Sequence, residues 1–208
     1  MNTLWEKENK MEKMKIFDTY ETKDVQVEDP GLKEYIGLDE KLVLRTLGRT
    51  KQRFAKNKIN IIERMANLLA VAGHRGKKHK IINKHSTGKY EKNMKIMLKT
   101  LNIIETKTGK NPVQVLVKAI ENAAPRDEVT VIEYGGARYP QAVDASPSRR
   151  VAVSMRNIVH GSYDKSFNKK TKIQEALANE IILASESKME SFAMGKKNES
   201  EKQADSAR

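Results

Sequence analysis

The sequence predicts a mainly α-helical fold: a bundle of about five to six helices with one protruding β-hairpin and a basic N-terminal arm. Apolar residues recur three and four positions apart in several separate segments, which is the spacing of helices that bury one face. One segment is rich in β-branched and aromatic residues and is interrupted by Gly135-Gly136, which is typical of two strands joined by a tight turn. Lysine and arginine are concentrated in stretches that show neither the helix spacing nor the strand pattern, and these stretches predict the arm and a loop.

Length and composition favour one hydrophobic core without disulfides. The chain has 208 residues, of which 32% are charged, and it has no cysteine. The lack of cysteine excludes disulfides, thiolate nucleophiles and cysteine-ligated zinc. There is no run of about 18 apolar residues, and the N-terminus is too charged for a signal peptide. We therefore expect a cytoplasmic protein without a membrane partner.

The net charge of +13 is distributed unevenly along the chain. Residues 41–110 hold 19 Lys and Arg against 3 Asp and Glu, whereas residues 1–40 hold 6 against 11 and residues 111–208 hold 15 against 13. Such a concentration of cations is the electrostatic signature of a protein that binds a polyanion. The segment contains no strongly amphipathic basic helix with Trp or Phe on its apolar face, so nucleic acid is favoured over an anionic membrane.

The N-terminal quarter of the chain divides into two parts. Residues 1–29 are acidic and show no clean apolar period, which predicts a flexible extension. Residues 30–58 begin with a turn signal and continue as a basic arm that becomes ordered on binding. Residues 59–208 are predicted to form the helical domain. The cations of the arm that we expect to bind RNA are Arg45, Arg49, Lys51, Arg53, Lys56 and Lys58.

The first predicted helix begins at Ile59, and Gly73 is its expected C-cap. A basic loop follows, whose candidate RNA-binding cations are Arg75, Lys77, Lys78, Lys80, Lys84 and Lys89. Its glycines do not have the spacing of a phosphate-binding P-loop. His74, His79 and His85 lack nearby carboxylates and lie among cations, so we predict no metal and favour contact with RNA or with solvent.

Two further helices precede the predicted hairpin. Met94, Met97 and Leu101 begin the apolar stripe of the first, which Gly109 closes. Asn111 is the expected N-cap of the second, Pro112 is its first residue, and Pro125 ends the segment.

The hairpin is predicted over residues 128–144, with Tyr134, Gly135 and Gly136 at its tip. Pro140 cannot donate a hydrogen bond to a neighbouring strand, so the ribbon should project rather than join a larger sheet. Ser146 and Pro147 then begin a helix. The cations and the aromatic residue of this region form either a phosphate-binding surface or a solvated basic face, and both interpretations stay open: Arg126, Arg138, Tyr139, Arg149, Arg150 and Arg156.

The C-terminal part is predicted to hold one more core helix and a weakly ordered tail. Thr171 and Gln174 have the spacing of a capping box, which places the start of a helix there. The tail, residues 185–208, is rich in Ser, Lys and Glu, and we expect at most a weak final helix. Ser200 and Gln203 occupy positions where a packed helix would be expected to carry apolar residues.

The order of motifs resembles the protein seven family of the small ribosomal subunit, in its archaeal type. The resemblance rests on N-P-V-Q-V-L-V-K-A-I-E-N-A-A-P-R at Asn111–Arg126, the Gly-Gly turn, Q-A-V-D-x-S-P, the Arg-Arg pair and M-R-x-I. It implies a structural protein that binds the 3′ major domain of small-subunit rRNA first and nucleates assembly of the head. It also implies a hairpin near exit-site tRNA and mRNA, head proteins as neighbours, and no cofactor.

Other functions are less favoured by the residues themselves. The sequence lacks the motifs of metalloproteases, serine hydrolases and dinucleotide-binding enzymes, so we predict no catalysis. A helix-turn-helix-like DNA-binding protein is the main alternative, although the cations lie mostly outside helices. A scaffold for acidic proteins is a third possibility, and nuclease sensitivity of the complex would separate it from an RNA-binding protein.

Overall fold

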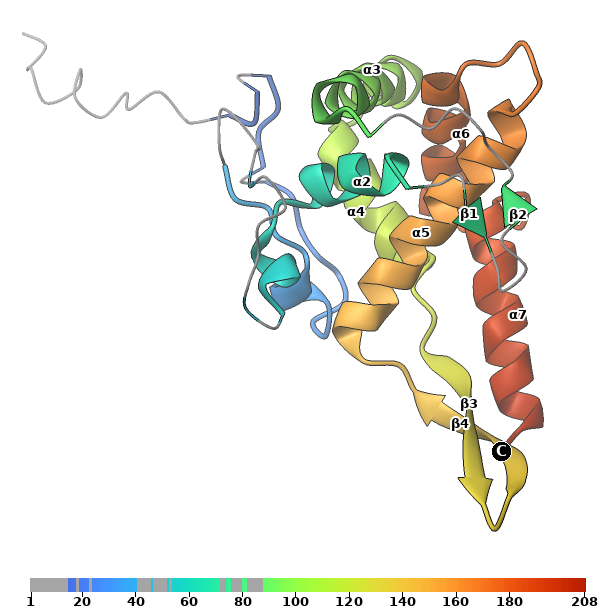
Figure 1. Cartoon of the computed structure of the whole chain (residues 1–208). Coiled ribbons are helices and arrows are strands. Elements are labelled where there is room, and N and C mark those ends of the chain that lie inside the picture. The colour runs from blue at the N-terminus through green and yellow to red at the C-terminus, as the bar shows by residue number, and fades with distance from the viewer. Residues whose placement is uncertain are drawn as a thin grey trace, which may run out of the picture.

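The computed structural model describes residues 15–17, 19–22, 24–40, 46, 52, 54–71, 74–75, 80–81 and 88–208, with the backbone alone for 74–75 and 80–81. These residues confirm a mainly helical fold with one projecting hairpin (Figure 1). The α-helices are α2 (Ile61–Leu69), α3 (Tyr90–Thr108), α4 (Pro112–Asn122), α5 (Pro147–Ser166), α6 (Ile173–Ser185) and α7 (Phe192–Ser206). Two short 3-10 helices are η1 (Lys33–Tyr35) and η2 (Ala55–Lys58). The strands are β1 (His74–Arg75), β2 (Lys80–Ile81), β3 (Asp127–Tyr134) and β4 (Ala137–Asp144), paired as β1 with β2 and β3 with β4.

Helix ends follow the capping residues that the sequence predicts in most places. The Asn111 side chain accepts a hydrogen bond from the Val113 N–H at 3.0 Å, and Pro112 is the first residue of α4. Gly109 closes α3 with a positive φ of 64°, a conformation that costs glycine little.

Two predicted caps are wrong. Helix α2 ends at Leu69 rather than near Gly73, because the N–H groups of Ala70 and Val71 return to carbonyls three residues earlier and tighten the last turn. The N-cap of α6 is Lys172 rather than Thr171, and it makes no side-chain capping bond.

Helix α6 lies at the centre of the body and packs against α3, α4 and α5. Its Leu177 and Ile181 are fully buried, as are Leu101 from α3, Leu116 from α4 and Ile158 from α5. These residues occupy the inward positions that the apolar spacing predicts. Within the described part of the chain, no helix is both long and apolar enough to cross a membrane.

The described residues of the segment expected to be a flexible acidic extension pack on the body. Ile16 is fully buried, and so is Leu32 in the segment that follows. Residues 24–29, which we call the strap, run beside α4, where the Gln114 carboxamide bonds to both the N–H and the C=O of Gln26. Periodicity gives no sign of this, because single apolar anchors hold an irregular segment.

The C-terminal tail contains the fifteen-residue helix α7, where the sequence predicts at most a weak one. Ala193 and Ala204 are fully buried, so small side chains provide its contact surface. Ser200, at a position where an apolar residue was expected, donates a hydrogen bond to the carbonyl of Asp127 at 3.2 Å. The packing therefore uses close approach and polar contacts instead of large apolar side chains.

The buried carboxylate of Glu180 on α6 joins α5 and α7. It accepts bonds from the Lys165 ammonium at 2.6 Å, the Ser191 hydroxyl at 2.7 Å and the Ala193 N–H at 3.2 Å. Gly161 of α5 lies directly beside this contact. A Cβ at this position would lie 2.6 Å from the Cβ of Phe192 and 3.1 Å from the Glu180 carboxyl group.

We predict that Gly161→Ala lowers the free energy of unfolding by about 1–3 kcal/mol, because the added methyl group separates α5 from α7. Alanine in a helix otherwise stabilises it by up to about 1 kcal/mol relative to glycine. Gly195→Ala in α7 is the matched control, since a Cβ there meets nothing within 4 Å. Urea denaturation would measure both, and equal midpoints for the two variants would contradict the prediction.

Candidate nucleic-acid interface

The hairpin has the tight turn that the sequence predicts. Tyr134 pairs with Ala137, and Gly135 and Gly136 between them have positive φ values of 59° and 82°. Positive φ at both central residues defines a primed turn, which matches the twist of the flanking strands. Pro140 lies opposite Val131, and β3 and β4 form a separate two-stranded sheet that projects from the body (Figure 1).

The free end of the hairpin exposes aromatic and apolar side chains. Tyr134 is 82% exposed and Tyr139 is 58% exposed. The register puts Ile132 opposite Tyr139, so these residues share one face with Tyr134, whereas Val131 lies on the other face. Arg138 is exposed on the other face, with Val131, and pairs across the strands with Glu133 at 3.6 Å. Exposed rings on one face of a projecting ribbon suit stacking on unpaired bases.

The base of the hairpin is held by α7 on one side and by α5 on the other. Glu201 of α7 accepts the Arg126 N–H at 3.1 Å, and Arg208, just after α7, pairs with the Asp127 carboxylate at 2.5 Å. From α5, the Arg149 guanidinium pairs with Glu128 at 2.6 Å. These contacts fix the direction in which the hairpin leaves the body.

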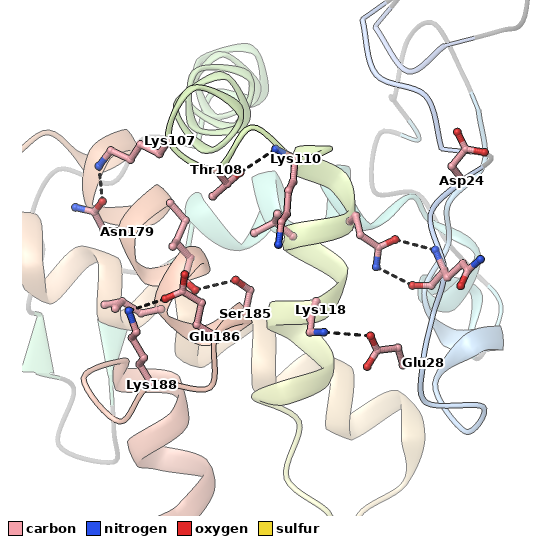
Figure 2. Close-up of a pocket in the computed structure, with 15 residues that line it drawn as sticks. Asp24, Glu28, Lys107, Thr108, Lys110, Lys118, Asn179, Ser185, Glu186 and Lys188 are labelled. Atoms are coloured by element: carbon pink, nitrogen blue, oxygen red, sulfur yellow. Dashed lines mark hydrogen bonds and ion pairs between the residues drawn. The ribbon is translucent and has the colours of Figure 1, made fainter.

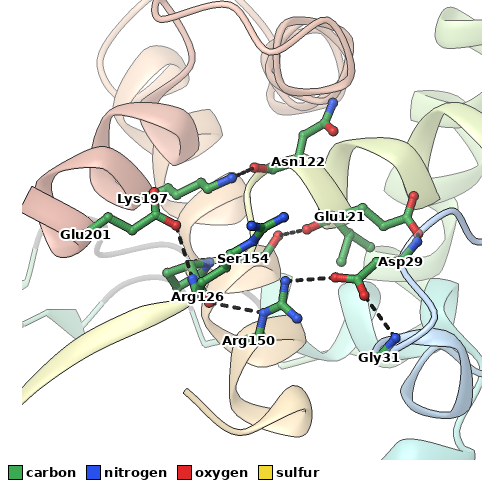
Figure 3. A network of polar contacts seen from close by, with 11 residues as sticks. Asp29, Gly31, Glu121, Asn122, Arg126, Arg150, Ser154, Lys197 and Glu201 are labelled. Carbon is green, nitrogen blue, oxygen red and sulfur yellow. Dashed lines mark hydrogen bonds and ion pairs between the residues drawn. The ribbon is translucent and has the colours of Figure 1, made fainter. Parts of the chain in front are cut away.

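The three arginines predicted on the exposed side of the helix differ in their surroundings. Arg149 and Arg156 are exposed, and Arg156 has no ion pair with any described residue. The Arg150 side chain is only 13% exposed and is wrongly predicted to face solvent. Its guanidinium donates to the Asp29 carboxylate at 2.9 Å and to the Pro125 carbonyl at 3.2 Å (Figure 3). Arg150 thus ties the strap to the start of the hairpin.

Glu121 of α4 adds a second contact to this network. It accepts the Asp29 N–H at 3.1 Å. Burial raises the pKa of the Glu121 carboxyl group above its ordinary value. Hydrogen bonds from the backbone of Glu28 and Asp29 lower this pKa, whereas the negative charges of their side chains raise it.

The described part of the arm is attached to the body close to Arg149. Ser148 donates a hydrogen bond to the Asn57 carboxamide at 2.9 Å, which brings η2 against the first turn of α5. Lys56 and Lys58 on η2 are exposed. Earlier in the arm, Thr46 donates two hydrogen bonds to the buried Glu63 carboxylate, from its N–H at 2.8 Å and from its hydroxyl at 2.6 Å.

Several predicted site residues cannot be placed. Arg45, Arg49, Lys51, Arg53, Lys77, Lys78 and Lys84 lie outside the described residues, and Arg75 and Lys80 are described by their backbones only. Lys89 is exposed just before α3. His79 and His85 also lie outside the described residues. Among the residues that are described, no three His, Asp or Glu side chains gather closely enough to hold a metal ion.

One exposed cluster was missed by the sequence analysis. Phe167 is exposed in the connection between α5 and α6, followed by the exposed Lys169, Lys170 and Lys172. None of the three lysines has an ion pair with a described residue. An aromatic residue inside a lysine run is the signal that could have identified this cluster.

Replacing neighbouring arginines of α5 should give two different phenotypes. Arg149→Ala is expected to weaken RNA binding and reduce the salt slope of the affinity by roughly 0.7–0.9, the effect of one lost phosphate contact. Arg150→Ala is expected to lower the free energy of unfolding by about 2 kcal/mol, because Asp29 loses its charged partner. Filter binding across a salt series and urea denaturation would separate the two. The assignment fails if Arg149→Ala leaves the slope unchanged or if Arg150→Ala is fully stable.

Comparison with known proteins gives the same assignment as the motifs. The family model described as ribosomal protein S7p/S5e matches residues 41–208. The small ribosomal subunit protein uS7 of Nanoarchaeum equitans is 53% identical over 197 residues, which cover 94% of this chain and 100% of the relative. The protein of the same name from Methanothermobacter thermautotrophicus is 45% identical over 193 residues, which cover 92% of this chain and 98% of that relative. The one from Archaeoglobus fulgidus is 43% identical over 198 residues, which cover 95% of this chain and 96% of that relative. These archaeal relatives confirm the archaeal type of the resemblance, and the family consists of ribosomal proteins rather than enzymes. The chain therefore belongs to the S7p/S5e family of ribosomal proteins.

Proposed function

We propose that this protein is a structural rRNA-binding component of the small subunit of the cytoplasmic ribosome. It binds the 3′ major domain of small-subunit rRNA directly and helps to nucleate assembly of the head. Its hairpin lies near exit-site tRNA and the mRNA, and neighbouring head proteins are its other partners. Membership of the family supports the ribosomal assignment, and the arrangement of the basic side chains supports the RNA-binding role.

The observation that carries the proposal is the junction between the arm and α5. The Ser148–Asn57 hydrogen bond joins a basic segment that is distant in sequence to the helix start that carries Arg149. Lys56, Lys58 and Arg149 are exposed around this junction. The N-terminal end of α5 adds the positive end of its helix dipole. Such a convergence of cations suits the backbone of a folded RNA, whose phosphates approach from several directions.

The hairpin supplies a different kind of contact. Its exposed rings at Tyr134 and Tyr139 can stack on unpaired bases, while α5 and α7 hold its base at a fixed angle. A projecting ribbon with aromatic side chains suits a site where RNA strands pass the protein. This division assigns primary rRNA binding to the body and contact with tRNA and mRNA to the hairpin.

The alternative of a helix-turn-helix-like DNA-binding protein is less well supported. Among the described α-helices, α3 and α4 have the shortest connection, so α4 would be the recognition helix. However, α4 buries Val113, Leu116, Val117 and Ile120 in the core. The strap covers another face of α4 through Gln114 and Lys118, so the helix is not free to enter a major groove.

The proposal is tested by comparing an rRNA fragment with duplex DNA. The purified chain is expected to prefer a 3′ major-domain fragment over duplex DNA of equal length, and to keep this preference as salt rises. Non-specific binding is mainly electrostatic and should decrease steeply with salt for both ligands. Equal affinities that vanish together in a filter-binding salt series would overturn the proposal.

The aromatic face of the hairpin should affect transfer RNA more than ribosomal RNA. We predict that Tyr134→Ala with Tyr139→Ala leaves affinity for the rRNA fragment within about twofold, because the body makes that contact. The same variant should weaken retention of tRNA at the exit site of reconstituted subunits, since each lost base stack costs about 1–3 kcal/mol. Val131→Ala, on the opposite face, is the control. A large loss of rRNA affinity in the tyrosine variant would show that the hairpin belongs to the primary site.

A further inference from the structure

A groove of about 1110 Å³ opens beside the strap, on a side of α4 that the proposed RNA contacts do not use (Figure 2). Its other walls are the C-terminal ends of α3 and α6. None of the cations predicted to bind RNA lines it. The lining combines lysines, carboxamides and apolar side chains, so its chemistry differs from that of the basic arm and loop.

The strap shows how this surface binds an extended chain. Gln114 accepts the Gln26 N–H at 2.8 Å and donates to the Gln26 carbonyl at 3.0 Å, which satisfies the backbone as a neighbouring strand would. One turn further along α4, the Lys118 ammonium pairs with the Glu28 carboxylate at 3.1 Å. Helix α4 therefore binds an acidic extended segment through one carboxamide and one lysine.

The groove repeats these groups without using all of them. Within the described part of the chain, Lys107 bonds to the neutral carboxamide of Asn179 at 2.7 Å, and neither Lys107 nor Lys110 has an ion pair there. Val115, Ile182 and Leu183 supply apolar surface beside these groups. Two cations without carboxylate partners, a carboxamide and an apolar floor form a site for another extended acidic segment.

The charge balance of the groove favours a peptide over RNA. Lys118 and Lys188 are neutralised by Glu28 and Glu186, the latter pair at 2.7 Å. Asp24 of the strap also lines the groove, so its four lysines and three carboxylates give a net charge of only +1. The C-terminal ends of α3 and α6 add negative partial charge. An RNA backbone brings several phosphates and needs more uncompensated cations than two, whereas a peptide with one or two carboxylates matches Lys107 and Lys110.

We propose that an extended acidic segment of a neighbouring protein occupies this groove in the assembled particle, beside the strap, with its carboxylates on Lys107 and Lys110. This inference rests on the proposed function, because assembly supplies the neighbour. The strap forms one wall of the site and the ends of α3 and α6 form the opposite wall.

Lysine footprinting with acetic anhydride tests the occupant. The reagent is applied to the free chain, to the chain bound to the rRNA fragment, and to complete small subunits, and acetylation is read by mass spectrometry. Lys107 and Lys110 are expected to react equally in the first two states and to be protected about tenfold in the third. Protection already in the rRNA complex would overturn the proposal in favour of RNA, and full reactivity in complete subunits would overturn it in favour of an empty groove.

A charge-reversal variant provides an independent readout. Wild-type and Lys110→Glu chains are mixed in equal amounts and incorporated into particles, first with the rRNA fragment alone and then with all the subunit proteins. Equal incorporation is expected with rRNA alone, and depletion of the variant by about fivefold with the complete set, because like charges repel across the interface. Equal incorporation in both would overturn the proposal. Failure of the wild-type chain to bind the fragment would instead count against the proposed function. In that case, comparing the lysine footprints of the free chain and of complete subunits would still show whether the groove is occupied.

Discussion

The buried carboxylate of Glu180 joins three helices, and the direction of the hairpin depends on it. Because Lys165 of α5 and Ser191 and Ala193 at the start of α7 all donate to this group, α7 begins at a fixed point on the body. Helix α7 then reaches the base of the hairpin, where Ser200 and Glu201 bond to its backbone. A polar contact in the core thereby sets the geometry of a surface element. Gly161 is required beside it because a larger residue would hold the helices apart.

Electrostatics divides the cations of this protein into two classes. Arg150 is buried against a carboxylate of the strap and holds the fold together, whereas Arg149, Arg156, Lys56 and Lys58 lie at the surface. Adjacent residues can belong to different classes, as Arg149 and Arg150 do, because successive side chains on a helix point about 100° apart. The acidic N-terminal part of the chain therefore has a structural role, since the carboxylates of the strap neutralise cations that support the body.

The sequence predicts those features that depend on local physics. The helix stripes, the caps at Asn111 and Gly109, and the turn at Gly135-Gly136 follow from spacing and backbone preference, and the structure confirms them. The strap was not foreseen, and α7 was expected only as a weak helix, because their anchors are scattered apolar residues, alanines and serines, which give no periodic signal. The role of Arg150 was missed for another reason, since its partner Asp29 is remote in sequence and only the fold brings them together.

The hairpin also has consequences for the protein before it joins a particle. In the described part of the chain neither outer edge of β3 or β4 pairs with another strand, so both present backbone groups that could pair with a second molecule. Its exposed apolar side chains, Val131 and Ile132 among them, would favour such pairing. Pro140 has no N–H to offer on β4, and the charges of Glu133 and Arg138 lie next to the tip. Such residues limit edge-to-edge self-association of the hairpin before the protein joins a particle.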